Sequence, residues 1–183
     1  QADDGLGSQV ERLKADRQKA SELANALRGK NWDVVFDQIC YTANEAKKIC
    51  ELLQGQTQNL IFTSSQSVYD SGALLTEDTF NPAAYEFSKE VTPTEDYSEA
   101  KRQCETVFAR HPELHPVMVR FPLVVGRDDY TGRLAWHVQR CANGLPIYFP
   151  NVNAKLSFIR SDRAGKALHQ IMDSSIEGPV NCA

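Results

Sequence analysis

Short apolar runs alternate with amphipathic stretches along most of this chain. The amphipathic stretches repeat apolar residues three or four positions apart, as helices do, whereas the short runs are continuous, as in buried strands. The helix candidates cover residues 20–27, a stretch after Thr42 that buries Ala46, Ile49, Cys50 and Leu53, and residues 96–109, 134–142 and 161–171. The strand candidates cover residues 10–13, 33–37, 59–63 and 116–121, and a further strand starts at Val180.

The alternation of strands and helices predicts a doubly wound α/β fold with a parallel sheet. The strand at 59–63 is continuously apolar, which suits a parallel strand covered by helices on both faces. Residues 42–45 read Thr-Ala-Asn-Glu and have the residue types and spacing of a capping box at the start of a helix. Beyond Gly126 the pattern loosens, which marks a change in organisation.

The composition limits the class of protein. Of the 183 residues, 42% are hydrophobic and 24% are charged, which is typical of a globular domain. The net charge of -4 provides no broad positive field for a phosphate backbone, so nucleic acid is disfavoured as a partner. No apolar run approaches the ~18 residues needed to cross a bilayer, and the first residues lack the features of a secretory signal. We therefore expect a cytoplasmic protein that is not associated with a membrane.

The five cysteines are scattered and never spaced as CxxC, and the four histidines form no HExxH motif. The sequence therefore supports neither a metal site nor a disulfide framework. We expect reduced thiols that are mostly buried.

Two groups of polar residues are candidates for chemistry, because ligands of open α/β sheets bind beyond the carboxyl ends of the strands. In the first group, Tyr97 and Lys101 are four residues apart and share one face of the helix over 96–109. A neighbouring ammonium favours the phenolate and lowers the pKa of a tyrosine from about 10 toward a value useful for proton transfer. Taken alone, such a pair more often lies on a solvated helix face.

The second group, Phe62-Thr63-Ser64-Ser65-Gln66-Ser67-Val68-Tyr69, lies at the end of a buried strand upstream of Tyr97. A hydroxyl at this place can bind a substrate carbonyl or alcohol and orient it toward Tyr97. Taken alone, the segment also reads as a serine-rich turn that satisfies its own backbone. The two groups together make a more specific prediction than either one.

Residues 64–69 read S-S-Q-S-V-Y and resemble the S-S-x-x-V-Y-G strand end of the extended short-chain dehydrogenases/reductases, the NAD-dependent epimerase/dehydratase group. Asp70 stands where that family usually has glycine. The resemblance implies that Ser65 takes the place of the catalytic serine or threonine and Tyr97 that of the acid/base. Lys101 takes the place of the lysine that binds the nicotinamide ribose and tunes the tyrosine.

The resemblance extends over nearly the whole chain and implies a Rossmann-like fold. A nucleotide-binding domain is expected over residues 1–126, interleaved with a partial, small C-terminal substrate-binding region over 127–183. The implied cofactor is NAD or NADP, and the residues expected to bind it are Asp16, Arg17, Cys40, Tyr41, Thr63, Ser64, Tyr97, Lys101, Phe121, Pro122 and Val124. The substrate candidates are Gln66, Arg133 and Arg160, and Arg120 and His137 are further candidates for an anionic substrate. For each of these charged side chains, surface solvation is an equally good explanation.

One departure from the family pattern is serious. The sequence contains no G-x-x-G-x-x-G turn, the motif whose backbone N–H groups approach a pyrophosphate. The segment Gly5-Leu6-Gly7-Ser8 does not replace this turn, because no strand precedes the segment. The family's first strand lies between the strands that we assign to 10–13 and 33–37. We therefore expect that an N-terminal βαβ unit of roughly 40 to 60 residues is missing from this chain, through truncation or disorder.

We predict an enzyme in which Tyr97 exchanges a proton with a hydroxyl or carbonyl of a small molecule or nucleotide sugar, while nicotinamide exchanges a hydride. Reduction, oxidation and epimerisation all use this step, so the reaction stays open. The alternative is a non-catalytic regulator or RNA-associated protein that has kept the fold, and a catalytically silent fragment is a third interpretation. Relatives commonly dimerise through the helix that bears the tyrosine, so the resemblance also implies a homodimer.

Overall fold

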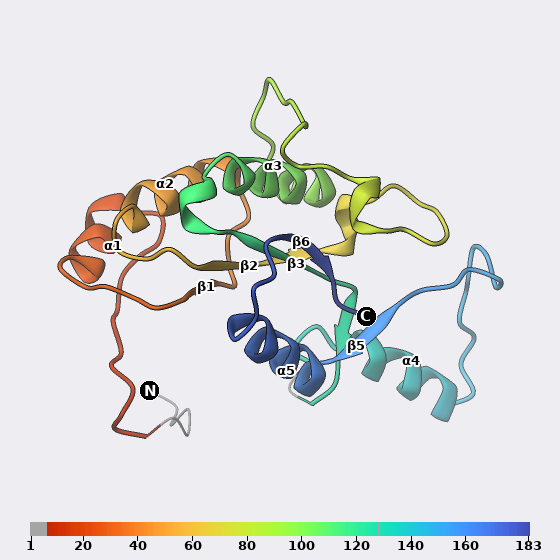
Figure 1. The fold of residues 1–183 in the computed structure, drawn as a ribbon. Coiled ribbons are helices and arrows are strands. Elements are labelled where there is room, and N and C mark those ends of the chain that lie inside the picture. The colour runs from red at the N-terminus through yellow and green to blue at the C-terminus, as the bar shows by residue number, and fades with distance from the viewer. Residues whose placement is uncertain (1–6, 128) are drawn as a thin grey trace.

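The computed structural model describes residues 7–127 and 129–183 (Figure 1). The helices are α1 (Ala20–Leu27), α2 (Ala43–Leu53), α3 (Tyr97–Ala109), α4 (Arg133–Ala142) and α5 (Ser161–Met172), and short 3₁₀ turns are η1 (Gln66–Val68), η2 (Glu77–Thr79) and η3 (Pro112–Leu114). The strands are β1 (Val35–Asp37), β2 (Leu60–Ser65), β3 (Val117–Phe121), β4 (Leu123–Val125), β5 (Phe158–Arg160) and β6 (Gly178–Asn181). The predicted helices are confirmed. Among the described residues, none of them is both long and apolar enough to span a membrane.

Four strands form one parallel sheet in the order β1-β2-β3-β6. The register places Val35 beside Leu60 and Ile61 beside Val117. β4 and β5 form a separate parallel pair. Figure 1 shows α2 and α3 on one face of the four-stranded sheet and α5 on the other. This arrangement confirms the predicted α/β, Rossmann-like fold.

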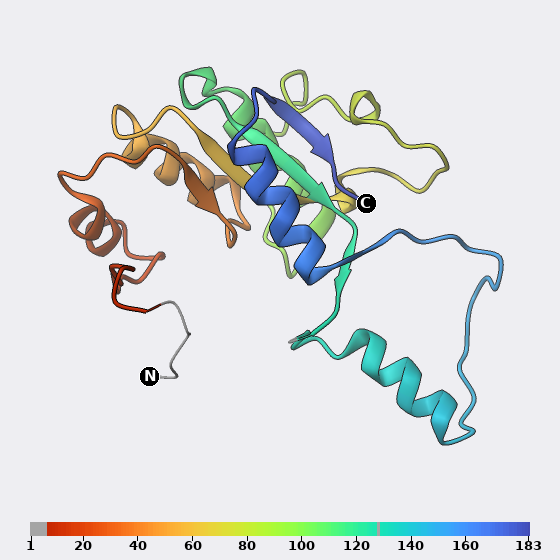
Figure 2. The same cartoon turned by 60° about the horizontal axis from the view of Figure 1, so that its bottom comes forward.

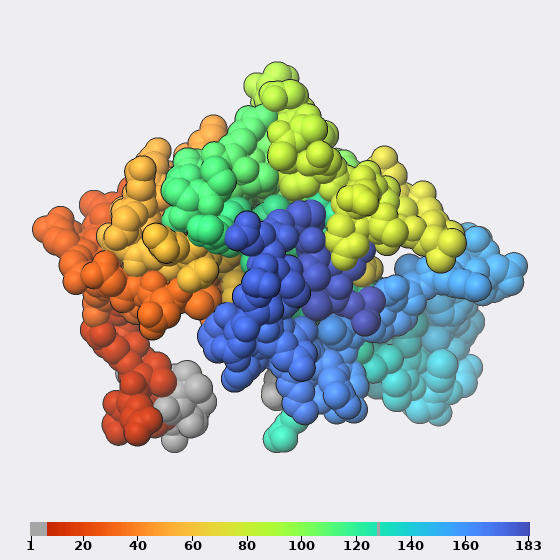
Figure 3. Space-filling model, viewed as in Figure 1, coloured from red at the N-terminus to blue at the C-terminus, as the bar shows by residue number. Residues whose placement is uncertain are grey.

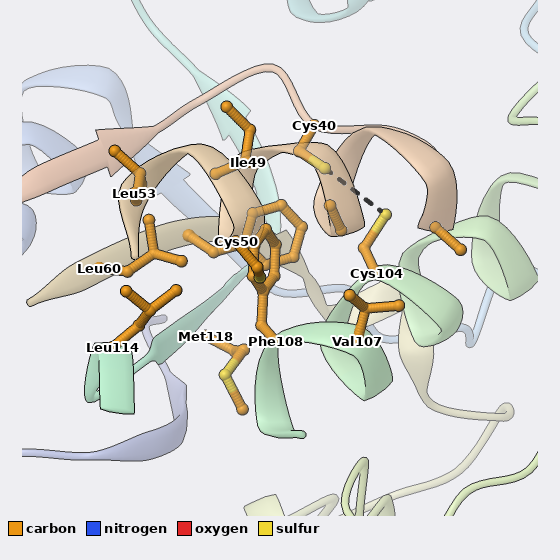
Figure 4. Packing of buried hydrophobic residues seen from close by; sticks show 13 residues of the cluster. Cys40, Ile49, Cys50, Leu53, Leu60, Cys104, Val107, Phe108, Leu114 and Met118 are labelled. Carbon is orange, nitrogen blue, oxygen red and sulfur yellow. Dashed lines mark hydrogen bonds between the residues drawn. The ribbon is translucent and has the colours of Figure 1, made fainter. Parts of the chain in front are cut away.

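Alternate residues of β2 face opposite sides of the sheet and enter two hydrophobic clusters. Leu60 and Phe62 are fully buried beneath α2 and α3, and the rings of Phe62 and Phe108 lie 4.8 Å apart. Figure 4 shows Leu60 and Phe108 within this cluster. Ile61 faces the other way and packs in a cluster with Ala164 of α5. Burial of each large apolar side chain stabilises the fold by about 1.5–3 kcal/mol, so β2 is held from both faces.

Side-chain caps fix the starts of the two helices that border the carboxyl ends of the strands. Thr42 Oγ1 accepts the Glu45 N–H at 3.2 Å at the start of α2, and an oxygen of Asp96 accepts the Glu99 N–H at 3.0 Å at the start of α3. The predicted capping box on α2 is present in altered form, because the Glu45 carboxylate accepts the N–H of Tyr41 at 2.8 Å rather than that of Thr42. Caps of this kind stabilise a helix by about 0.5–2 kcal/mol.

The strand predicted over residues 10–13 is wrong, because residues 10–16 are irregular in the structure. Val10 and Leu13 are 40% and 41% exposed. A strand needs a neighbour for its backbone N–H and C=O groups, and the described part of the chain places no strand beside this segment.

Residues 130–157 lead away from the sheet and carry α4 (Figure 2). None of the residues of α4 is buried. The chain then returns through β5 to α5 and β6, both of which belong to the main body. The domain boundary that we place after residue 126 stays a prediction.

The last strand closes the sheet beside the loop that follows β2. The Asn181 N–H donates to Glu77 Oε1 at 2.7 Å, and the Tyr69 hydroxyl donates to Asn181 Oδ1 at 2.7 Å. Figure 3 shows the dark blue C-terminal residues packed against this yellow-green loop. The loop is therefore fixed to the sheet at two points near the end of β2.

Candidate active site

A cavity of about 730 Å³ opens at the carboxyl ends of β2 and β3. Its wall includes Ser65 and Gln66 from the end of β2, Tyr97 from the start of α3, Phe121 from β3, and Arg133 from α4. This is the edge of a parallel sheet at which α/β proteins bind their ligands. The second polar group singled out in the sequence and Tyr97 of the first therefore meet at one cavity, whereas Lys101 is not in its wall.

Ser65 lies at the turn between β2 and η1. Its Oγ accepts the N–H of Ser67 at 3.1 Å, so the segment does satisfy part of its own backbone, as a serine-rich turn would. A serine hydroxyl that accepts a hydrogen bond keeps its proton for donation to a second partner. The turn and the proposed contact with a ligand oxygen are therefore compatible.

Lys101 lies one turn beyond Tyr97 on α3, and only 2% of its surface is exposed. Its Nζ donates to the carbonyl oxygens of Cys40 at 2.9 Å and Thr63 at 3.0 Å, which connects α3 to β2 and to the loop after β1. Burial lowers the pKa of Lys101 below its ordinary value. The two carbonyls satisfy two of the three ammonium protons and leave one for a further partner.

The pKa of Tyr97 is shifted in the direction opposite to the one expected. Burial raises it above the ordinary value, and the Ser65 side chain opposes this rise. Lys101 is not among the main groups that act on the phenol, because its ammonium is directed at the Cys40 and Thr63 carbonyls. Tyr97 therefore holds its proton at neutral pH in this arrangement.

A model of the NAD dependent epimerase/dehydratase family matches residues 10–183. The chain belongs to this family. A search of curated proteins finds no match.

Solved structures of epimerases and dehydratases share the fold. A UDP-glucuronic acid 4-epimerase from Bacillus cereus has a TM-score of 0.69 at 16% identity, covering 97% of this chain and 61% of that one. A dTDP-glucose 4,6-dehydratase from Bacillus anthracis has a TM-score of 0.68 at 16% identity, with coverages of 92% and 57%. A UDP-N-acetylglucosamine 4-epimerase from Methanobrevibacter ruminantium has a TM-score of 0.63 at 20% identity, with coverages of 88% and 57%. The chain spans about three fifths of the length of each of these proteins.

Some of the cofactor residues implied by the family resemblance line the cavity, namely Thr63, Ser64, Tyr97, Phe121, Pro122 and Val124. Two of their hydroxyls already have protein partners. Thr63 Oγ1 donates to Gln38 Oε1 at 2.6 Å, and the Ser64 hydroxyl donates to the Glu105 carboxylate. The roles of these residues toward a cofactor stay predictions.

Asp16 and Arg17 lie outside the cavity wall, and their side chains bond to other residues of the protein. Arg17 forms a bidentate ion pair with Asp37, with Nη1–Oδ1 and Nη2–Oδ2 distances of 2.8 and 2.6 Å. Asp16 Oδ1 accepts the N–H of Gln18 at 2.9 Å. Cys40 and Tyr41 also lie outside the wall, and both contact Lys101, through the Cys40 carbonyl and the Tyr41 ring.

The structure separates the substrate candidates. Gln66 and Arg133 line the cavity, whereas Arg160 is not in its wall and donates to Asp162 Oδ1 at 2.9 Å on the exposed surface. His137 Nδ1 donates to the Arg133 carbonyl at 2.8 Å within α4. Arg133 and Gln66 are therefore the two candidates with direct access to a ligand in the cavity.

Arg120 is fully buried, so its prediction as an anion-binding residue is wrong. Its guanidinium forms an ion pair with Glu105, with Nη2–Oε2 and Nε–Oε1 distances of 2.6 and 3.0 Å. Nη1 also donates to the Tyr69 hydroxyl at 2.8 Å and to the Glu77 carbonyl at 3.0 Å, and Nη2 donates to the Phe80 carbonyl at 3.0 Å. Every side of the guanidinium is occupied by the protein itself.

Glu105 is a residue of this site that the sequence analysis missed. It connects the buried arginine to the end of β2, because its carboxylate also accepts the Ser64 hydroxyl. Burial raises the pKa of Glu105, and the hydrogen bonds from Arg120 and Ser64 oppose this rise. A signal was available, since Glu105 follows Lys101 by four residues and therefore lies on the same face of α3.

Proposed function

We propose that this chain carries the catalytic centre of an NAD(P)-dependent oxidoreductase or epimerase that acts on a hydroxyl or carbonyl of a small molecule or nucleotide sugar. The observation that carries the proposal is the meeting of Ser65 and Tyr97 at one cavity, with the Lys101 ammonium bonded to the strand that ends in the serine. Membership of the NAD dependent epimerase/dehydratase family supports it.

The residues at this edge of the sheet fit the nicotinamide end of such a cofactor. Phe121, Pro122 and Val124 give the cavity an apolar wall suited to a flat ring, and Lys101 has a proton left for a ribose hydroxyl. When bound, the nicotinamide would supply or accept the hydride. NAD accompanies the Bacillus dehydratase and the glucuronic acid epimerase, and we keep NADP as the second choice.

Residues of this chain carry out the proton transfer and position the reacting groups. Tyr97, protonated at neutral pH because burial raises its pKa, donates its proton to a carbonyl oxygen and recovers it from a hydroxyl in the reverse direction. The Ser65 hydroxyl donates a hydrogen bond to the same oxygen and holds it near the phenol. Lys101 binds the hydroxyls of the cofactor ribose with the ammonium proton that the Cys40 and Thr63 carbonyls leave free.

A nucleotide sugar is the substrate class that we favour. Arg127 and Arg133 line the cavity, and guanidinium groups suit phosphate oxygens through charge-assisted hydrogen bonds. The similar epimerases were solved with UDP-N-acetylmuramic acid and with UDP-4-deoxy-4-fluoro-glucuronic acid. The same kind of ligand is therefore the first to test on this chain.

The test is a turnover assay of the purified protein with NAD⁺ or NADP⁺ and a panel of UDP-sugars, dTDP-sugars and small carbonyls. Product is followed by chromatography and the cofactor by absorbance. Tyr97→Phe removes the proton donor and lowers turnover by about 10²- to 10⁴-fold. Tyr148→Phe is the matched control, because Tyr148 is 86% exposed and outside the cavity. Equal turnover by Tyr97→Phe and the unmodified protein would remove Tyr97 from the mechanism.

A further inference from the structure

The Lys101 ammonium lies between two aromatic rings of very different exposure. Its Nζ is 4.6 Å from the centroid of the Phe62 ring and 4.6 Å from that of the Tyr41 ring. Phe62 is fully buried in the core, whereas Tyr41 is 37% exposed. Tyr41 is therefore the cover on the solvent side, and with this ring in place only 2% of the Lys101 surface is exposed.

The backbone beneath the Tyr41 ring is anchored. Asp37 is held by Arg17 and accepts the N–H of Ile39 at 3.2 Å, and the N–H of Tyr41 donates to Glu45 at 2.8 Å. These contacts fix the loop between β1 and α2 from both ends. Access to Lys101 therefore requires rotation of one side chain rather than displacement of the loop.

The Tyr41 side chain itself is held weakly. Among the described residues, no hydrogen bond is formed by its hydroxyl, so the ring is held in place by packing and by its contact with the ammonium. A cation–π contact at a partly exposed position is weak enough to be exchanged for a hydrogen bond with a ligand hydroxyl.

We propose that Tyr41 is a positioning residue that covers the ammonium of Lys101 and must rotate away before ligand hydroxyls can bind it. Rotation of the ring exposes the one ammonium proton that the Cys40 and Thr63 carbonyls do not use. The inference deepens the proposed function, since the ligand hydroxyls in question are those of the cofactor ribose.

The cover is tested by the rate at which the Lys101 ammonium protons exchange with water, measured by ¹⁵N NMR at fixed pH and temperature. The signal is assigned with Lys101→Arg. Tyr41→Ala removes the ring and speeds exchange by about 2- to 30-fold, the range that corresponds to the strength of a cation–π contact. Tyr41→Phe keeps the ring and leaves the rate unchanged. Tyr41→Leu, which keeps apolar bulk without a π face, is the second variant and also exchanges faster.

The ligand side is tested with NAD⁺ as the probe, by calorimetry on the same proteins. Tyr41→Ala binds NAD⁺ more tightly than the unmodified protein, by the same factor of about 2 to 30, while Tyr41→Phe does not differ. Unchanged exchange rates in both the Ala and the Leu variant, or equal NAD⁺ affinities where NAD⁺ binds, would overturn the inference. If no variant binds NAD⁺ while the exchange pattern holds, the cover stands and the proposed cofactor function fails.

Discussion

Replacement of Arg120 by methionine is the sharpest test of how the site is built. Methionine has a similar length and no charge, so Arg120→Met leaves the backbone of β3 in place and removes only the guanidinium. The change leaves the Glu105 carboxylate in the core without its partner. It also leaves the carbonyls of Glu77 and Phe80 without the donors that they have now.

The size of the effect follows from the burial of the pair, since both side chains have no exposed surface. Removal of one partner of a buried ion pair costs about 3–5 kcal/mol, because the remaining charge is neither solvated nor paired. That is a large share of the roughly 5–15 kcal/mol by which a domain is stable. Arg120→Met with Glu105→Leu removes the isolated charge and recovers part of the loss. Recovery stays incomplete because the two carbonyls remain unsatisfied.

Urea unfolding followed by circular dichroism measures the free energy of unfolding of each protein, and the pH dependence gives an independent check. Without Arg120, the rise in the pKa of Glu105 that burial causes is still opposed by the Ser64 hydrogen bond and the Lys101 charge but no longer by the guanidinium. The pKa of the folded variant is therefore raised further, and the folded variant binds a proton more tightly than the unfolded chain does. The stability that comes from this proton is fully present below the unfolded pKa and is lost as the pH rises through the folded pKa. The variant is therefore less destabilised at about pH 5 than at about pH 8. A loss below about 1 kcal/mol, with no difference between the two pH values, would refute the reasoning.

Three further predictions concern other parts of the chain. Arg133→Gln weakens the binding of UDP-sugars by roughly 10- to 100-fold in calorimetry, because a charged donor to phosphate is lost, and equal affinity would exclude Arg133 from the site. Gly126→Ala lowers the free energy of unfolding by about 1–3 kcal/mol, because Gly126 has φ +140° and an added Cβ would lie 2.8 Å from Ser161 Oγ. Gly165→Ala is the matched control, because an added Cβ at this position in α5 has no atom within 4 Å. The control raises the free energy of unfolding by about 1 kcal/mol. With a thiol-specific disulfide reagent, Cys141 reacts first because it is exposed, and the half-buried Cys182 reacts more slowly because burial raises its pKa. The buried Cys40, Cys50 and Cys104 react only on unfolding, and burial raises the pKa of Cys50 to about 12. A fast phase that survives in the Cys141→Ser, Cys182→Ser double variant would contradict this.

The helices were predictable because their information is local. The apolar spacing on α1 and the Thr42 and Asp96 caps lie within the segments that they specify. The strand expected over residues 10–13 failed because a strand depends on a neighbour, which the apolar pattern of the segment itself does not reveal.

The candidate site was predictable as a set of residue types and less so as a set of contacts. The spacing of Tyr97 and Lys101 placed both on one face of α3, but it did not show that the ammonium is directed at the carbonyls of Cys40 and Thr63. Arg120 was misread because a charged residue at the end of a strand suggests a ligand. Its partner is fifteen positions earlier on another element, at a separation that no local pattern reports.

The face of α3 that enters the core carries chemistry as well as packing. Lys101 and Glu105 are buried on this helix together with the apolar Ala100, Cys104 and Phe108. Buried polar groups must be paired, so both side chains form hydrogen bonds with neighbouring strands or loops. Lys101 donates to the carbonyls of Cys40 and Thr63. Glu105 accepts from Ser64 and Arg120. The same bonds that satisfy the core thereby set the position of the end of β2 relative to Tyr97. Mutations that disturb either polar partner should consequently affect stability and the alignment of the site together.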